Sequence, residues 1–576
     1  MLVIEGWRKD TRWPRADAVV NLQDIGRKQN GQYSPRWLVL AVVVALLSVW
    51  FAGIDYRKLA NPDEGRYAEI PREMAETGDW LTPRLNNIKY FEKPPLQYWI
   101  TAAAYRAFGF HEWTARLWVA LTGIGGIFLT WFMGRRLFGR EGGAAAALVL
   151  LSSMYYVIFS NVLTLDMGFS FFLNLALAGY LLAQQTQGNE RVSTAWAVMS
   201  WASAALAVLS KGFAGFVLPA LALVTYTVMQ RDWSGWRNLR LVPGGLLALL
   251  IAAPWFIGVS VANPEFFEFF FVHEHLQRFA STAHHRAGPL WYFVPLVLVA
   301  VLPWMAVTAE GLVEAWRYRA QPDTFNAPRF LLAWIVSQFV FFSISGSKLP
   351  AYILPIVPAL ALITGWRLSQ LNGRQIAKRV APLAVVAGIA YLAGTEAMEA
   401  MQAKQIGFNY YEDYSDWLET ASVLIAVAGV YLWWKRDAKR MAVAGFGIAC
   451  FIAAELVVAG FEQLSPLQSA YNLAQTIKPY LKEDTPVFMV QTYNQSLPPY
   501  IQRPVTLVDY EDELYFGLQQ EPERWIPTLD EFVPVWRSQQ QAVAVMPAKT
   551  FQKLEEMALP MRVIESRDDL RVVIRP

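Results

Sequence analysis

Two adjacent stretches organise this chain: the apolar run WLVLAVVVALLSVWFAGI at residues 37–54, and the polar run DEGRYAEIPREMAETGDWLTPRLNNIKYFEK at residues 63–93. An apolar run of this length predicts a helix that crosses a bilayer, whose hydrocarbon core is roughly 30 Å thick. Two adjacent carboxylates, Asp63 and Glu64, open the polar run. Such a segment is held at the water–lipid boundary, where chemistry on the polar head of a lipid would take place.

Similar apolar runs recur along the 576 residues, of which 55% are hydrophobic and 17% charged. About thirteen candidate membrane spans can be placed, at 37–54, 115–133, 143–160, 164–183, 195–209, 213–229, 241–260, 289–308, 328–345, 350–366, 381–395, 417–434 and 441–460. The sequence therefore predicts an all-α polytopic membrane protein. The first run is too long for a cleavable signal peptide. The single cysteine, Cys450, lies in an apolar run, so no intramolecular disulfide is expected.

The short loops indicate which ends of the spans face the cytoplasm, because cytoplasmic loops carry an excess of Lys and Arg. Every basic cluster follows an even-numbered span, and the basic N-terminal tail agrees with this pattern. The N-terminus is therefore expected in the cytoplasm and, with an odd number of spans, the C-terminus on the far side. All five histidines fall in the outer loops, which predicts catalysis at the outer face.

The chain divides into two expected domains. Residues 1–462 form a transmembrane catalytic domain with long outer loops at 55–114 and 261–288. Residues 463–576 alternate short β-branched runs with helical patterns, which predicts a small soluble α/β domain. This domain shows neither a Gly-rich phosphate loop nor a metal-ligand cluster, and docking or shielding is its simplest role. No nucleotide cofactor is expected.

Asp63 is the first candidate catalytic residue, although a carboxylate at a span exit can also be an ordinary solvated acid. The residues after it repeat at three- and four-residue spacings, with one charged face and one apolar face: Arg66, Glu69, Arg72, Glu73 and Glu76, against Tyr67, Ile70 and Met74. This pattern predicts an amphipathic helix along the membrane interface, with Asp63 at its N-terminal end.

Two ionisable residues interrupt apolar runs. Asp166 lies at the start of LTLDMGFSFFLNLALAGYLL, and Lys211 lies in LAVLSKGFAGFVLP. Charged groups at such positions are costly unless they pair or line a wet cavity. The two residues either form a structural ion pair or line a cavity for an anionic ligand. Lys348, at the end of another span, is expected to extend its ammonium group toward the interface.

The second of the long outer loops combines an aromatic run, typical of an interfacial helix packed into lipid, with hydrogen-bond donors. His273 and His275 are two residues apart, which places them on one face only in a strand. This loop alone does not predict a metal site, and a site shared with Glu92 stays open. Arg278 and Lys93 together suit a phosphate, because Arg binds two oxygens and Lys supplies a point charge.

Seven motifs occur in order along the chain: PDEGRYAEIPREM, YFEKPP, LTLDMGF, LSKGF, FFVHEHLQRF, HHRAGPLWYFVP and SKLPAYILP. In this order they resemble the lipid A 4-amino-4-deoxy-L-arabinose transferases, which are GT-C glycosyltransferases related to protein O-mannosyltransferases. The likeness covers essentially the whole chain and implies the GT-C fold. Members of that family usually carry Thr where this chain has Gly65, a change that is not expected to affect the chemistry.

The resemblance also implies roles for residues of this chain. Asp63 would be the essential catalytic carboxylate, with Asp166 as a second catalytic candidate. The substrate-binding residues would be Arg66, Glu92, Lys93, Lys211, Arg278 and Tyr352. Residues matching Lys93 and Arg278 hold the carrier phosphate in the family, and a divalent ion such as zinc lies between residues matching Glu92 and His273.

The family's substrates would be undecaprenyl phosphate-linked aminoarabinose and lipid A, met at the periplasmic face of a bacterial inner membrane. Adding the cationic sugar lowers the negative charge of lipid A and weakens polymyxin and similar peptides. A single displacement would invert the anomeric carbon, with Lys93 and Arg278 stabilising the leaving phosphate. A phosphate monoester has a second pKa of about 6 and is already a nucleophile. Asp63 is therefore expected to orient a substrate or cation more than to remove a proton.

Two other functions stay open. A related GT-C enzyme could transfer another polyprenyl phosphate-linked sugar, such as a hexose, to protein or to a glycan. A lipid transporter would explain Asp166 and Lys211, but it would not explain the polar groups at one face, and the sequence shows no internal repeat. Nucleic acid is not expected as a partner, and the protein is expected to be a monomer among membrane lipids.

Overall fold

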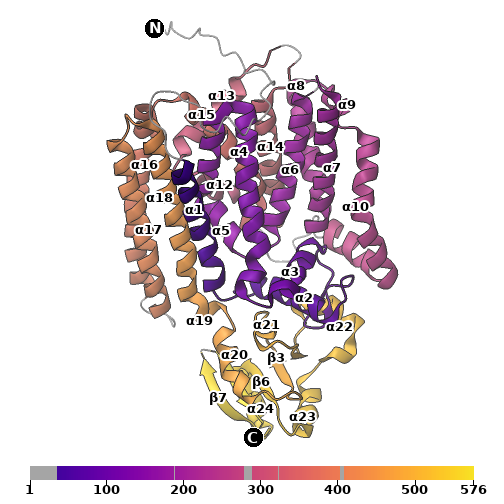
Figure 1. Cartoon of the computed structure of the whole chain (residues 1–576). Coiled ribbons are helices and arrows are strands. Elements are labelled where there is room, and N and C mark those ends of the chain that lie inside the picture. Colours follow the sequence, from indigo (N-terminus) through magenta and orange to yellow (C-terminus); the bar gives the residue numbers. More distant parts are fainter. Residues whose placement is uncertain are drawn as a thin grey trace.

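The computed structural model describes residues 36–186, 188–277, 288–321, 324–402, 408–567 and 569–575. A bundle of long helices makes up most of the molecule, and a small domain of strands and helices lies against one end of it (Figure 1). The fold class expected from the sequence, an all-α transmembrane region followed by a C-terminal α/β domain, is confirmed.

Nine helices in the described part of the chain are long and apolar enough to cross a membrane. They are α4 (Glu112–Leu151), α6 (Asp166–Gln185), α7 (Glu190–Lys211), α10 (Leu241–Ala262), α14 (Ala327–Ile344), η3 with α15 (Pro350–Gln370), α16 (Gly373–Gln402), α17 (Phe408–Trp434) and α18 (Lys439–Gly460). The pair α12 (Phe293–Val301) and α13 (Met305–Arg317), bent by 105°, gives up to ten. Two shorter apolar helices are α1 (Arg36–Tyr56) and α8 (Ala214–Gln230).

The second and third predicted spans are joined within α4. Gly139, with φ +79° and ψ −177°, interrupts the helix and turns the chain back on itself. A methyl group on Gly134 would lie 2.8 Å from the Cα of Gly143, so glycine is what lets the two halves approach so closely. The returning half continues into α5 (Met154–Asn161). Each of the thirteen predicted spans thus falls on helical structure.

Helix α1 runs toward the end of the bundle that faces the C-terminal domain (Figure 1). The end away from the C-terminal domain carries the basic clusters, and ion pairs there connect neighbouring helices. Arg367 of α15 pairs with Glu310 of α13 at 3.0 Å, and Arg379 of α16 pairs with the same carboxylate at 2.6 Å.

The C-terminal domain contains a six-stranded sheet with the order β5-β4-β3-β6-β8-β7. The strands are β3 (Val487–Val490), β4 (Thr506–Val508), β5 (Trp525–Ile526), β6 (Val543–Pro547), β7 (Arg562–Arg567) and β8 (Leu570–Ile574). The first four pair in parallel, and β7 and β8 are antiparallel. Helices α23 (Leu529–Ser538) and α24 (Ala548–Glu556) contribute Trp536 and Leu554 to the core. Five of these strands were predicted from β-branched runs at 486–491, 504–509, 542–546, 561–564 and 571–574, and β5 was missed.

Between the bundle and the C-terminal domain lie α2 (Asp63–Thr77), the strands β1 (Arg84–Leu85) and β2 (Ile88–Lys89), and α3 (Leu96–Phe108). The turn of this hairpin is fixed to the C-terminal domain by Asn86, whose side chain exchanges two hydrogen bonds of 2.7 Å with the backbone of Val505. Arg84 donates to both carboxylate oxygens of Glu521, at 2.9 and 3.0 Å. The C-terminal domain therefore docks directly on the polar stretch at residues 63–93.

Candidate active site

Helix α2 begins at Asp63, whose side chain is 53% exposed and pairs with Arg66 one turn later at 3.1 Å. The predicted helix with Asp63 at its N-terminal end is confirmed, but it has no apolar face open to lipid, because residues 64–74 are all buried. Their charges are balanced within the protein, as at Arg72, which pairs with Glu69 at 2.6 Å and with Glu76 at 2.5 Å. Since buried charges are tolerated when they are paired, α2 can lie inside the protein rather than along a membrane surface.

The C-terminal domain supplies a residue to the start of α2. One guanidinium nitrogen of Arg66 pairs with Asp63, and another pairs with Glu513. Gln495 also donates to the Glu513 carboxylate, at 2.6 Å. Burial raises the pKa of Glu513, and the positive charge of Arg66 opposes that rise. Sequence reasoning indicated Arg66 but missed Glu513, because an acid so far along the chain carries no local sign of its partner.

Gly65 permits this close approach of the two domains. A methyl group at Gly65 would lie 2.4 Å from the backbone nitrogen of Ser496 and 2.5 Å from the carbonyl carbon of Gln495. The same backbone nitrogen donates to the side chain of Asn61 at 2.8 Å. Gly65 is thus a direct contact between α2 and the C-terminal domain.

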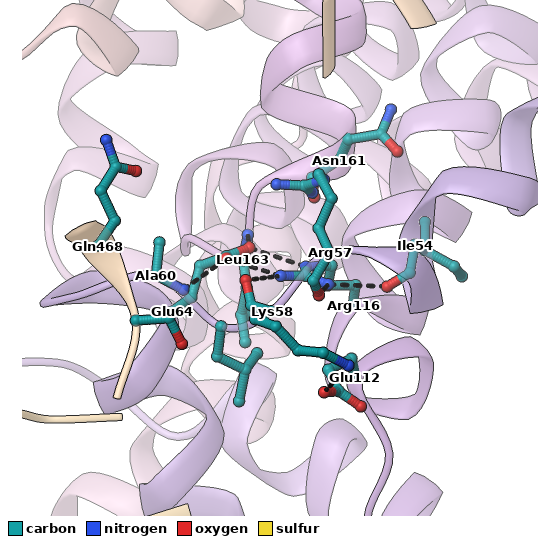
Figure 2. A network of polar contacts seen from close by, with 12 residues as sticks. Ile54, Arg57, Lys58, Ala60, Glu64, Glu112, Arg116, Asn161, Leu163 and Gln468 are labelled. Carbon is teal, nitrogen blue, oxygen red and sulfur yellow. Dashed lines mark hydrogen bonds and ion pairs between the residues drawn. The ribbon is translucent and has the colours of Figure 1, made fainter. Parts of the chain in front are cut away.

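Glu64, the neighbour of Asp63, lies at the centre of a buried network (Figure 2). Arg116 of α4 donates to its two carboxylate oxygens at 2.8 and 2.7 Å. The backbone nitrogens of Ala60 and Leu163 donate to the same carboxylate at 3.0 and 2.9 Å. Burial alone would raise the pKa of Glu64, but the ion pair and hydrogen bonds with Arg116 outweigh burial and hold it at about 2. Glu64 is therefore a structural residue.

Tyr67 marks the region where separate elements converge. Burial raises the pKa of its phenol; the charge of Arg66 lowers it, and the charges of Asp63, Glu92 and Asp166 raise it further. These three carboxylates belong to the start of α2, the loop before α3 and the start of α6. The structure thus brings three acids that the sequence singled out within electrostatic reach of one phenol.

Asp166 and Lys211 form an ion pair at the end of the bundle that faces the C-terminal domain. Asp166 begins α6 and Lys211 ends α7, and the Lys211 ammonium lies 4.9 Å from the ring centre of Tyr352 in η3 (Pro350–Ile356). Their side chains are 14% and 17% exposed, so the pair is not sealed from water. The ion-pair interpretation therefore holds, and an anion can still approach the Lys211 charge.

Glu92 and Lys93 lie side by side, with the Lys93 ammonium 3.5 Å from the Glu92 carboxylate and 3.0 Å from its carbonyl oxygen. Nearby Tyr90 and Tyr98 are buried, and within the described ranges their hydroxyl groups have no hydrogen-bond partner. Buried polar groups are nearly always satisfied by protein, water or ligand. Tyr98 also stacks on Tyr67, with ring centres 6.3 Å apart. The sequence did not reveal these buried hydroxyl groups, because tyrosines at these spacings resemble core residues.

The remaining predicted ligands cannot be placed in this site. His273 belongs to η2 (Glu268–Gln277), but its side chain, like the whole of Arg278, lies outside the described residues. Among the residues that are described, no group of three His, Cys, Asp or Glu side chains could hold a metal ion. The metal site between Glu92 and His273 thus stays a prediction.

The aromatic run that leads into η2 packs on protein more than the sequence suggested. Phe266 and Phe270 are fully buried, and Phe266 contacts Phe91 edge to face with ring centres 5.2 Å apart. Phe267 is 59% exposed and is the side chain placed to meet lipid. The predicted helix in lipid is therefore correct for one face only.

Lys348 does not extend toward the interface as predicted. It is 6% exposed, and its ammonium donates to the carbonyl oxygens of Ser343 and Ser345 at 2.8 and 2.9 Å. These carbonyls lie at the C-terminal end of α14, where the helix dipole favours a positive charge. Lys348 is thus a helix cap rather than a site residue.

Two family models match parts of the chain. An aminoarabinose transferase C-terminal domain matches residues 473–576, and a dolichyl-phosphate-mannose-protein mannosyltransferase matches residues 92–257. An undecaprenyl phosphate-alpha-4-amino-4-deoxy-L-arabinose arabinosyl transferase of Pseudomonas fluorescens is 34% identical over 57% of this chain and 59% of that protein. One from Aeromonas salmonicida is 34% identical over 56% and 58%. The match thus spans about three fifths of the length of these curated relatives.

Solved structures extend the comparison to nearly the whole chain. ArnT from Cupriavidus metallidurans bound to undecaprenyl phosphate has a TM-score of 0.88 and 37% identity, covering 94% of this chain and 99% of that one. The apo state of the same protein has a TM-score of 0.86 and 38% identity, with 94% and 98% covered. With this fold and this level of identity along its length, the chain belongs to the ArnT family of aminoarabinose transferases.

Proposed function

We propose that this protein transfers 4-amino-4-deoxy-L-arabinose from undecaprenyl phosphate to a phosphate group of lipid A. The main support is that the charges of Asp63, Glu92 and Asp166 all act on the buried phenol of Tyr67, in a chain that has the ArnT fold. A solved member of the family, similar over 94% of this chain, binds undecaprenyl phosphate. Lys93, beside Glu92, and Lys211, beside Asp166, supply the positive charge that a lipid phosphate requires.

The reaction is a single displacement at the anomeric carbon. An oxygen of the lipid A phosphate bonds to C1 of the sugar, the bond from C1 to the carrier oxygen breaks, and undecaprenyl phosphate leaves with inversion at C1. Lys93, together with Arg278, stabilises the charge that develops on the leaving phosphate. Asp63 is exposed and held by Arg66, so it is placed to orient the acceptor or the amine of the donor. An ionised phosphate acceptor needs no general base.

The proposed location is a bacterial inner membrane, with the active site and C-terminal domain in the periplasm. The basic clusters gather at the bundle end opposite the C-terminal domain, and cytoplasmic loops are the ones enriched in Lys and Arg. The N-terminus is then cytoplasmic. Attaching a cationic sugar there would lower the negative charge of lipid A and give resistance to polymyxin and other cationic peptides.

A divalent ion between Glu92 and His273 is a separate proposal, on which no step above depends. Glu92 offers one partly exposed carboxylate, 19% exposed, beside Lys93. Elemental analysis of the purified wild-type protein and of the Glu92→Gln variant tests it. Equal metal content in the two proteins would reject Glu92 as a ligand.

Mass spectrometry of lipid A tests the function directly. A bacterium that lacks its own aminoarabinose transferase is complemented with the wild-type chain or with Asp63→Asn. A gain of one aminoarabinose with the wild-type chain alone is expected. The alternative is a related enzyme that glycosylates protein, suggested by the mannosyltransferase family match over residues 92–257. It would leave lipid A unchanged and alter a glycoprotein instead.

A further inference from the structure

An apolar cavity of about 370 Å³ lies between α6, α7, α8, α9 (Gly235–Asn238) and α10, away from the candidate active site. This volume falls in the range of ligand pockets, roughly 300–1,000 Å³. Its walls are almost entirely apolar and include Leu177, Trp201, Leu223, Trp236 and Ala248. Leu241 and Leu249, which also line it, are 48% and 60% exposed, so the cavity opens at the surface beside α10.

The lining offers little to water. The indole nitrogen of Trp201 donates to the carbonyl of Leu239 at 2.7 Å, and that of Trp236 donates to the hydroxyl of Thr227 at 2.8 Å. A water molecule in a cavity needs two to four polar partners. Helix α10 lies at the edge of the bundle (Figure 1). Only 22% of its apolar stretch is buried inside the protein, so the helix faces lipid. A cavity of this kind in a bilayer fills with hydrocarbon.

Residues 231–240, which connect α8 to α10 at the end of the bundle away from the C-terminal domain, form a basic segment. It carries Arg231 and Arg237, both exposed, and Arg240, which pairs with Glu190 at 3.3 Å. Its one acid, Asp232, accepts a hydrogen bond of 2.8 Å from the backbone of Ser234. Trp233 in the same segment is 65% exposed, as is typical of side chains at the headgroup level.

We propose that this cavity binds an acyl chain of an anionic phospholipid, whose headgroup phosphate is held by Arg231 and Arg237. Basic residues beside apolar clefts between helices suit anionic headgroups. The isoprenoid tail of the sugar donor is a less suitable occupant. Lys211, the cation that would hold the donor's phosphate, lies at the opposite end of α7, whereas the cavity's own cations lie at the α9 end.

Thermal unfolding of the full chain in detergent tests this site. Gly245 lines the cavity, and a Cβ added there meets nothing within 4 Å, so Gly245→Phe adds a bulky ring at the cavity wall without a backbone clash. Gly394→Phe in α16 is a matched control, because its Cβ also meets nothing within 4 Å and Gly394 does not line the cavity. Dioleoyl phosphatidylglycerol should raise the melting temperature of the wild type and of Gly394→Phe by several degrees, by mass action.

In Gly245→Phe that shift should disappear, and in the double variant Arg231→Gln/Arg237→Gln it should fall to the shift given by dioleoyl phosphatidylcholine. Equal shifts from the two lipids in the wild type, or a full shift in Gly245→Phe, would overturn the proposal. A shift from undecaprenyl phosphate that Gly245→Phe abolishes would assign the cavity to the isoprenoid tail. If Gly245→Phe does not fold, a photoactivatable phosphatidylglycerol must label peptides of α7 or α10 in the wild type.

Discussion

Asp63 and Glu64 are neighbours in the sequence but occupy opposite environments. Glu64 is 2% exposed and accepts four hydrogen bonds, two from Arg116 and two from backbone nitrogens. Asp63 is 53% exposed and shares its partner Arg66 with Glu513 of the C-terminal domain. A carboxylate whose oxygens are all satisfied inside the protein fixes the fold. An exposed carboxylate whose arginine partner also pairs with a second carboxylate is free to bind a substrate.

The largest effect that tests this contrast is the loss of the partner of Glu64. Arg116→Gln would leave a buried carboxylate without its counter-charge, which typically costs about 3–5 kcal/mol. Thermal unfolding in detergent should show a large drop in the melting temperature. Arg374→Gln is the control, because the Arg374–Asp437 pair is 69% and 68% exposed and exposed pairs contribute little to stability. Similar losses in the two variants would mean that the Glu64 network is not structural.

The pH dependence of stability sharpens the same contrast. The pKa of folded Glu64, about 2, lies below its ordinary value of 4.5, so its stabilisation is present above pH 4.5 and is lost as the pH falls toward 2. A depression of this size corresponds to on the order of 3 kcal/mol. The difference in unfolding free energy between the wild type and Glu64→Gln should stay constant from about pH 7 to 5 and shrink below about pH 4.5. A difference that already shrinks near neutral pH would contradict this assignment.

For Asp63 the expected effect is on catalysis and not on stability. Asp63→Asn should lower transfer to lipid A by about 100-fold, the usual cost of misplacing a reacting group. Its melting temperature should match that of the wild type, since the Asp63 side chain is half exposed. Asp55→Asn, an acid at the end of α1, serves as a control for a general loss of charge. If Asp63→Asn keeps most of its activity with a phosphate acceptor, Asp63 is not needed even to orient a substrate.

Much of the fold could be predicted from local sequence. Apolar runs located the helices of the bundle, and the spacing of charges after residue 63 located the start of α2. What could not be predicted depends on partners that are distant in the chain. Lys348, at the end of an apolar run, was expected to extend toward the interface. Its ammonium instead caps α14, because it donates to the carbonyl oxygens of Ser343 and Ser345. The same limit concealed Glu513 and the burial of α2.

The smallest expected effect concerns the contact that sets Asp63 apart from Glu64. In Gly65→Ala, the added methyl would lie 2.4 Å from the nitrogen of Ser496, and overpacking of this kind costs about 1–3 kcal/mol. Alanine is a better helix former than glycine by about 1 kcal/mol. The two effects oppose each other, so the sign of the measured change in stability shows whether the contact is as close as the structure has it.

Gly394→Ala in α16 has the same gain in helix propensity with nothing within 4 Å of its Cβ, and it should be stabilised by up to about 1 kcal/mol. If Gly65→Ala is instead destabilised and loses transfer activity, the domain contact holds Gln495 and Glu513 against Arg66. If it is stabilised as much as the control and fully active, α2 and the C-terminal domain can separate at no cost. Helix α2 alone would then position Asp63, and the C-terminal domain would bind to the transmembrane domain without being part of the active site.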